Sequence, residues 1–223
     1  TAPTEIYTLS LHDALPIYLH ASLLPQYRGA APIQHAILND ERETGVTTFL
    51  LNEGIDEGNI LLQEKIAITT EETGGSLHDK LMQLGAEVTF KTIQGLEQGT
   101  LSPKPQPKVE GLRYATKIFK EDRLLSFQQE SAHAIALRIR AMSPYPSAIA
   151  TLGEEEIKVF KATPRPSLQG LQPGEYRVTK ESVVVQCTEG AVELWEVQFP
   201  NKRRTTIHDY LLGNSFPEGG RFN

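Results

Sequence analysis

A histidine and an aspartate stand where they could do chemistry together. His20 follows Tyr18-Leu19, and Asp56 lies between Gly54 and Gly58, 36 positions after the histidine. An imidazole that a carboxylate orients and holds charged can stabilise a developing oxyanion or carry a proton. Glycines around Asp56 let the backbone turn tightly and approach a ligand. The pair indicates acid–base or oxyanion chemistry, although loop His and Asp residues are most often solvated surface groups.

The elements around this pair should bring it to one edge of a sheet. Pro32 suits the first turn of a helix, where its missing N–H costs nothing. The β-branched run Val46–Leu51 predicts a strand, and Gly54 and Gly58 mark the loop that leaves it. The expected order is loop, helix, strand, loop and strand, over residues 20–29, 32–40, 46–51, 52–59 and 60–68.

A long helix should follow the second strand and end at Gly99. Ser76 with Asp79 resembles a capping box at its start. Its apolar residues recur on one face, as expected for an amphipathic helix: Leu77, Leu81, Leu84, Val88, Ile93 and Leu96.

The run 101–107 carries three prolines at alternate positions, which predicts an extended linker and the domain boundary. Beyond it we expect a helix over 127–142, stopped by Ser143-Pro144. Closely spaced short strands then indicate a small barrel, before a short terminal helix over 207–212. The strands are expected over 148–152, 157–162, 174–178, 183–187 and 191–197.

Composition excludes several classes of protein. The hydrophobic content of 39% and charged content of 22% are typical of a globular protein. No apolar run approaches a membrane span, and we expect a cytoplasmic protein without a signal peptide. Cys187 is the single cysteine and no residues show zinc-ligand spacing, so neither a disulfide nor a metal site is expected.

Charge is distributed unevenly along the chain. Residues 1–107 hold 6 Lys and Arg against 14 Asp and Glu, whereas residues 108–223 hold 16 against 14. Such an imbalance would suit a first half that handles a small ligand and a second half that approaches a polyanion, although compositional drift would give the same numbers.

Residues 1–17 do not fit the rest of the chain. They show neither helical nor strand periodicity, and they resemble a translated sequencing adaptor fused to an unrelated reading frame. We therefore expect them to be non-native, and His12 and Asp13 are assigned no role.

Ordered motifs from His20 onward resemble the 10-formyltetrahydrofolate-dependent formyltransferases, and among these the methionyl-tRNA formyltransferases. The motifs are His-Ala-Ser-Leu-Leu-Pro, Tyr-Arg-Gly-Ala-Ala-Pro-Ile, Thr-Gly-Val-Thr, Gly-Ile-Asp-Glu-Gly and, later, Ile-Arg-Ala-Met-Ser-Pro. The resemblance implies the carboxyl-side half of a Rossmann-like parallel-sheet domain over residues 18–100. An OB-like β-barrel domain that helps to hold tRNA should follow over 108–223.

The same resemblance implies the reaction and its residues. The methionine amino group on initiator tRNA would attack the formyl carbon of 10-formyltetrahydrofolate, a cosubstrate rather than a bound cofactor. His20 matches the family's oxyanion-stabilising His, and Asp56 matches the Asp that supports it and helps to remove the amine proton. Ser22, Leu23, Leu24 and Pro25 match the folate-contacting loop. Lys117, Arg140, Lys202, Arg203 and Arg204 are candidate phosphate contacts, or else ordinary solvated charges.

The chain also departs from the family. Tyr18 stands where the family has a second oxyanion donor, an Asn, and about a hundred residues of the family's domain would precede it. We therefore expect a truncated, impaired monomer with an unpaired sheet edge and exposed apolar faces. Two alternatives remain: a sugar-nucleotide or other amine formyltransferase, and a non-catalytic OB-type nucleic-acid-binding remnant.

Overall fold

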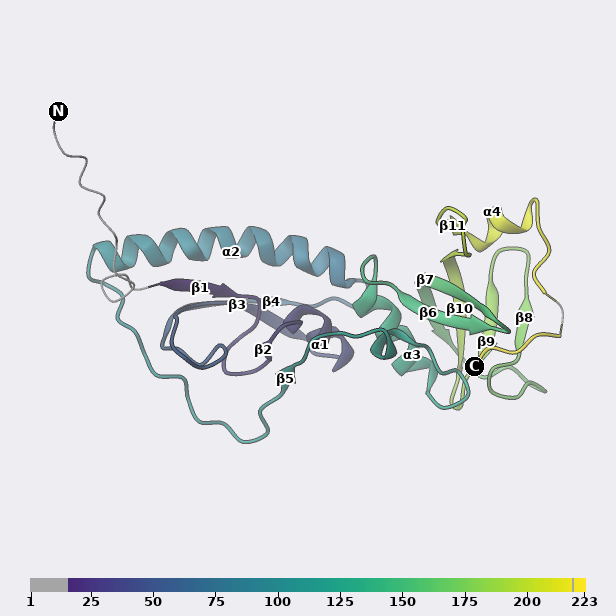
Figure 1. Ribbon diagram of the computed structural model, residues 1–223, viewed down its shortest axis with the longest axis horizontal. Helices are drawn as coiled ribbons and strands as arrows, with labels where there is room; N and C mark the ends of the chain where they lie inside the picture. The colour runs from purple at the N-terminus through teal and green to yellow at the C-terminus, as the bar shows by residue number, and fades with distance from the viewer. Residues whose placement is uncertain (1–15, 218) are drawn as a thin grey trace, which may run out of the picture.

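The computed structural model describes residues 16–217 and 219–223, which form two units side by side along the long axis of the molecule (Figure 1). The first unit contains β1 (Ile17–His20), β2 (Arg28–Gly29), α1 (Pro32–Leu38), β3 (Glu43–Leu50), β4 (Ile60–Ala67), α2 (Gly74–Glu97) and β5 (Tyr114–Ala115). The second contains η1 (Glu121–Arg123), α3 (Ala132–Met142), β6 (Ala148–Leu152), β7 (Glu155–Arg165), β8 (Tyr176–Val178), β9 (Val183–Gln186), β10 (Ala191–Gln198), β11 (Thr205–Thr206) and α4 (Ile207–Leu211). The expected class, a mixed α/β unit followed by an antiparallel barrel, is confirmed.

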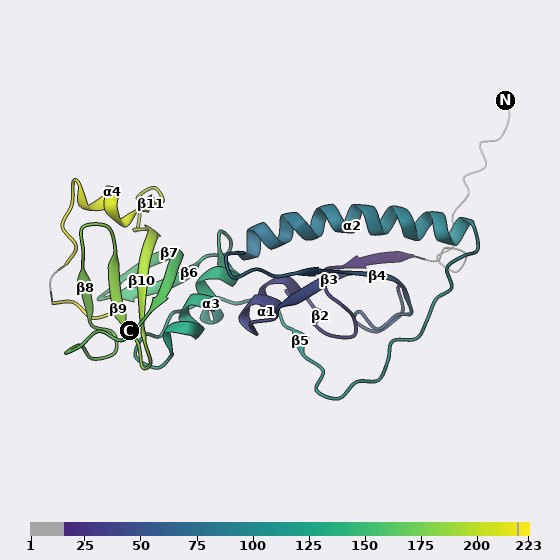
Figure 2. The same cartoon turned by 180° about the vertical axis from the view of Figure 1, so that it is seen from behind.

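The first unit is built on a three-stranded sheet in the order β1-β3-β4, and α2 runs along it (Figures 1 and 2). Both pairings are antiparallel. The loop between β3 and β4 is too short for the crossover that a parallel pair needs. Among the strands of the described residues, parallel pairing joins only β2 and β5, so the parallel part of the expected sheet is small here.

The edge strand β1 exposes apolar side chains, as the sequence predicted. Ile17, Tyr18 and Leu19 are each more than a third exposed, and Tyr18 packs only partly, against the ring of Phe49. Ile17 pairs with Leu50 of β3, so the expected boundary of the non-native segment falls inside a described strand. Residues 1–15 of that segment, with His12 and Asp13, lie outside the described residues.

Helix α2 begins three residues earlier than expected. Its N-cap is Thr73, whose hydroxyl accepts from the Ser76 N–H while the Ser76 hydroxyl accepts from the Thr73 N–H. The capping box therefore joins Thr73 to Ser76, and the prediction of Ser76 with Asp79 is wrong. Ile93 is 46% exposed, because the buried stripe passes through Thr92 instead.

The second unit is an antiparallel sheet in the order β6-β7-β10-β9-β8, with β11 added to β10. The carboxyl terminus closes it, since bridges join Phe222 to Leu152 of β6 and Arg221 to Glu175 beside β8. The side chain of Phe222 is buried in the same apolar core as Phe127. Residues 221–223 thus complete a barrel that strand prediction alone left open.

Helix α3 belongs to both units. It is shorter than expected, because Ser131 caps it and Phe127 lies before it in the barrel core. Ile135 and Ile139 pack into the barrel, whereas Leu137 and Ala141 pack with the first unit's apolar residues from α1, β3 and α2. The helix therefore joins two apolar cores.

Candidate functional site

The structure brings His20 and Asp56 together at the edge of the first sheet. His20 ends β1, and its Nδ1 lies 3.6 Å from Oδ2 of Asp56 in the loop after β3. The side chain of His20 is 4% exposed and that of Asp56 14% exposed. The separation is longer than a good hydrogen bond, as is common at sites without substrate. The two side chains nonetheless face each other where little solvent reaches them.

Backbone groups fix the carboxylate of Asp56. Its Oδ2 accepts the N–H of Gly29 at 2.8 Å. Asp56 itself has φ of 54°, a left-handed conformation that Asp tolerates better than most residues. Gly29 has φ of 123°, and a Cβ there would lie 2.4 Å from the carbonyl oxygen of Ala115. Glycine at position 29 is therefore needed where β2 meets β5, and its N–H points at the aspartate.

The other nitrogen of His20 contacts the main chain. Its Nε2 lies 2.8 Å from the carbonyl oxygen of Tyr27. The Tyr27 hydroxyl donates to Glu41, and burial together with that carboxylate raises the pKa of Tyr27 to about 12. Tyr27 therefore stays protonated at neutral pH and acts as a scaffold. A doubly protonated imidazole at His20 would be satisfied by Tyr27 and Asp56 together.

The predicted folate loop is held mostly in the interior. Ser22, Leu24 and Pro25 are buried and Leu23 is half-buried. The Ser22 hydroxyl donates to the Gln26 carbonyl at 2.7 Å, and Thr47 accepts from the Leu24 N–H at 3.1 Å. The loop thus fixes its own shape, and its contact with folate stays a prediction.

The five basic candidates differ in their surroundings. Arg140 donates to the carbonyls of Glu72 and Thr69, both at 3.0 Å, and burial lowers the pKa of its guanidinium. Arg204 forms a two-point pair with Glu196, each contact at 2.7 Å. Lys117, Lys202 and Arg203 are exposed, and the ammonium of Lys202 also donates to Asn214. Their role as phosphate contacts stays a prediction.

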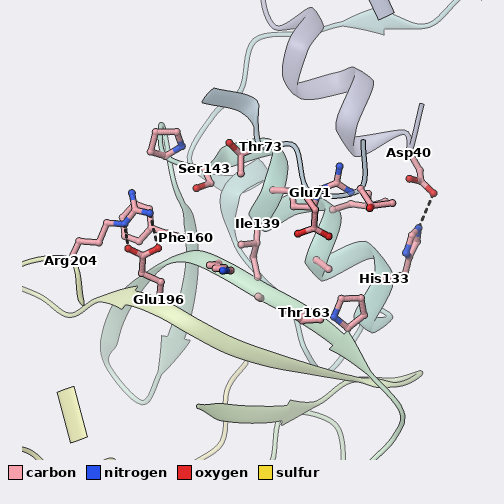
Figure 3. Close-up of a pocket in the computed structure, with 18 of the residues that line it drawn as sticks. Asp40, Glu71, Thr73, His133, Ile139, Ser143, Phe160, Thr163, Glu196 and Arg204 are labelled. Carbon is pink, nitrogen blue, oxygen red and sulfur yellow. Dashed lines mark hydrogen bonds and ion pairs between the residues drawn. The ribbon is translucent and has the colours of Figure 1, made fainter. Parts of the chain in front are cut away.

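A cavity of about 610 Å³ lies elsewhere, between the two units (Figure 3). Arg140 and Arg204 line it, and Figure 3 shows His133 reaching Asp40 at its edge, at 3.2 Å. Its charges are largely paired among themselves, and neither His20 nor Asp56 lines it. The pair of His20 and Asp56 therefore lies outside this cavity.

The described part of the chain holds no group of three or more potential metal-binding side chains, and none of its helices could cross a membrane. Cys187 is buried, and burial raises the pKa of its thiol to about 12, as expected for a packing residue.

Sequence reasoning missed the residues that frame the pair. Tyr27, Gly29, Arg28 and Gln106 all contact His20, Asp56 or the loop of Asp56. Tyr27 and Gly29 lie within a motif already singled out, which was the available signal. Gln106 lies among alternate prolines in the linker, where nothing in the local pattern indicated a site.

Comparison with known proteins identifies the family. Residues 9–93 match the family model described as formyl transferase, and residues 117–215 match the formyl transferase C-terminal domain. The methionyl-tRNA formyltransferase of Caldanaerobacter subterraneus is 39% identical over 217 residues, which cover 97% of this chain and 69% of that protein. The enzyme of that name from a Janthinobacterium species is 41% identical, over 88% of this chain and 62% of that protein. The chain thus spans about two thirds of the length of these relatives.

Solved structures share the fold at lower identity. HypX from Aquifex aeolicus in complex with tetrahydrofolic acid aligns with a TM-score of 0.69 at 22% identity, over 88% of this chain and 34% of that chain. An N-formyltransferase from Helicobacter canadensis, with folinic acid and dTDP-3-aminofucose, aligns with a TM-score of 0.65 at 24% identity, over 82% and 65%. These likenesses establish the fold.

Proposed function

The chain belongs to the methionyl-tRNA formyltransferase family, and on that premise we propose that it carries the catalytic pair for formylating methionine on initiator tRNA. The formyl donor is 10-formyltetrahydrofolate, and the reaction serves translation initiation in the cytoplasm. The approach of His20 to Asp56 is the observation that carries the proposal, because the pair meets from segments 36 positions apart.

The reaction needs a charged oxygen stabilised and a proton moved. The methionine amine attacks the formyl carbon, and the carbonyl oxygen becomes an oxyanion in a tetrahedral intermediate. When the intermediate collapses, the bond from carbon to folate nitrogen breaks. The amine loses a proton, and the folate nitrogen gains one. Formyl-methionyl-tRNA and tetrahydrofolate result, and no metal is required for this balance.

The geometry suggests how the two residues divide this work. Asp56 is the more exposed of the two, so an incoming amine meets the carboxylate before the imidazole. Asp56 is therefore proposed to take the amine proton and to support His20. His20 stabilises the oxyanion. For this, one of its ring nitrogens must leave its present partner, the Tyr27 carbonyl or the Asp56 carboxylate, and contact the substrate oxygen instead.

The remaining substrate contacts extend this proposal. Ser22–Pro25 would shape the folate site from beneath, since their buried loop positions the segment between His20 and Tyr27. Lys117, Lys202 and Arg203 are exposed and would contact tRNA phosphates, whereas Arg140 and Arg204 already have protein partners. Tyr18 replaces a family Asn, so we propose that one oxyanion donor is absent. Loss of such a donor typically costs about a hundredfold to a thousandfold in rate.

Choice of acceptor tests the function. The purified chain, alone and extended by the segment of a relative that it does not cover, is offered radiolabelled formyl-folate. One reaction contains methionyl-tRNA and the other an amino-sugar nucleotide. Label transfer to methionyl-tRNA is expected from the extended chain, and much less of it from the chain alone. Transfer to the sugar alone would overturn the proposal in favour of a sugar-nucleotide formyltransferase. Binding of tRNA without any transfer would favour a non-catalytic nucleic-acid-binding protein.

A further inference from the structure

The linker between the units reaches the Asp56 loop. Residues 101–107 run back along the first unit, where Lys104 and Ile60 exchange two backbone hydrogen bonds of 2.8 Å. This pairing fixes the register of the linker two residues before Gln106. The side chain of Gln106, half-buried, is thereby placed beneath the loop that carries Asp56.

The carboxamide of Gln106 makes every hydrogen bond of which it is capable. Its Nε2 donates to the carbonyls of Asp56, at 2.7 Å, and Gly58, at 2.9 Å. Its Oε1 accepts from Nε and Nη2 of Arg28, at 3.2 and 2.7 Å. An amide group has two donor hydrogens and two acceptor lone pairs, so all four positions are used. A surface glutamine placed by chance would not be saturated by protein groups in this way.

Arg28 closes the arrangement into a ring. Its Nη1 pairs with Glu57 at 3.0 Å, and its side chain is 12% exposed. Glu57 follows Asp56, and Arg28 precedes Gly29, whose N–H holds the Asp56 carboxylate. Gln106, Arg28 and Glu57 therefore form a ring of contacts. This ring holds the loop of Asp56 and also the segment of Gly29, whose N–H donates to the Asp56 carboxylate.

These contacts would matter because the local sequence alone does not fix the backbone conformation of the loop. Glycines at 54 and 58 allow several backbone paths, and the left-handed conformation of Asp56 has to be held by its surroundings. Displacement of a reacting group by about 1 Å can cost about a hundredfold in rate. We propose that Gln106 is a positioning residue for formyl transfer, and that its carboxamide holds the Asp56 loop so that the carboxylate faces His20. The inference rests on the proposed function of that pair.

The test compares Gln106→Met with Gln128→Met. Gln128 is a matched control, since it also donates to a backbone carbonyl, that of Phe222 at 3.0 Å, but in the barrel. Amide hydrogen exchange over residues 54–58 needs no substrate, and it should accelerate at least about tenfold in Gln106→Met but not in Gln128→Met. Unchanged exchange in Gln106→Met would overturn the proposal, even if the chain proves to have no formyl transfer activity.

Kinetics then separate positioning from general stabilisation. In the active form, Gln106→Met should lower kcat about tenfold to a hundredfold while the KM for tRNA is kept. In an Asp56→Asn background the same change should have little further effect, because Gln106 acts through Asp56. Equal losses in both backgrounds would contradict the proposal. If Gln106→Met does not fold, Gln106→Glu keeps the Arg28 contact, loses both donors to the loop and should show the same pattern.

Discussion

Asp56 is oriented by main-chain groups more than by other charges. The Gly29 N–H holds one carboxylate oxygen, and the Gln106 amide holds the carbonyl of Asp56 itself. Gly58 lies against the end of β3, where a Cβ would approach the Leu50 carbonyl oxygen to 1.6 Å. The position of the carboxylate thus depends on uncharged residues as well as on Arg28 and Glu57.

Replacement of Gly58 tests this dependence. Gly58→Ala must push the loop away from β3, and we expect it to lower the free energy of unfolding by about 1–3 kcal/mol, as overpacking does. Gly213→Ala is the control, because an added Cβ there meets nothing within 4 Å. Urea unfolding gives both values. Equal midpoints for the two variants would show that the loop has room to yield.

At the scale of elements, the turn before α2 connects the two units. Glu72 is buried, accepts from the Thr69 N–H at 2.6 Å and forms an ion pair with Lys80. Burial by itself would raise the pKa of its carboxyl, but Lys80 and Thr69 outweigh burial and lower that pKa below its usual value. Arg140 of α3 donates to two carbonyls of this turn, so the shape of the turn supports the contact between the two units.

The lowered pKa of Glu72 predicts a pH dependence of stability. A carboxyl whose pKa is lower in the folded than in the unfolded state stabilises the fold above the unfolded pKa. That contribution disappears as the pH falls through the folded pKa. The stability difference between the parent and Glu72→Gln should therefore be largest near neutral pH and shrink below about pH 4.5, the usual glutamate value. Urea midpoints from pH 7 to pH 3 measure it, and a constant difference would argue against the assignment.

The elements themselves were largely predictable from local pattern. Strand β6 was predicted at its observed bounds, because Ala148–Leu152 is a short apolar run between turns. The start of α3 was not, because the apolar Phe127 belongs to the barrel core and only the Ser131 cap marks the true beginning. The closure of the barrel by Phe222 depends on contacts distant in sequence, which periodicity cannot reveal.

The candidate site was only partly predictable, because some of its residues are recognisable by type and local pattern and others only by distant contacts. His20 and Asp56 carry chemistry in their residue types and lie on loops, so pattern and resemblance could find them. Gln106 carries no such signal, since its importance comes from contacts 48 and 50 positions away. Arg140 and Arg204 were candidates because of charge, and only the fold shows that each already has a protein partner.

At the scale of the molecule, α3 fixes the position of the barrel relative to the first unit. Its opposite faces belong to different apolar cores, so the barrel is held at a fixed place beside the first unit (Figure 2). A tRNA that contacts the barrel would therefore present its end at a defined position on the first unit. The exposed Lys202 and Arg203, on the loop before β11, are where such contact is proposed.

Salt dependence of tRNA binding tests that surface. Arg203→Ala should weaken binding and reduce the slope of log affinity against log salt by about one. Binding with one phosphate contact fewer releases fewer counterions from the tRNA. Arg204→Ala, the neighbouring control, should leave the slope unchanged, since its guanidinium is paired with Glu196. Filter binding between low and physiological salt gives the slopes. The opposite ranking would place the phosphate contact on Arg204.

His20 and Asp56 are proposed to act as one catalytic unit. The most direct measurement is the single-turnover rate of formyl transfer to methionyl-tRNA in the parent, His20→Ala, Asp56→Ala and the double variant. Each single change should lower the rate at least about a hundredfold, and the double variant should be little worse than either. His78→Ala should have no effect, although His78 also faces a carboxylate, Asp79, at 3.1 Å on the exposed side of α2. Formyl transfer that survives both changes at His20 and Asp56 would contradict the account.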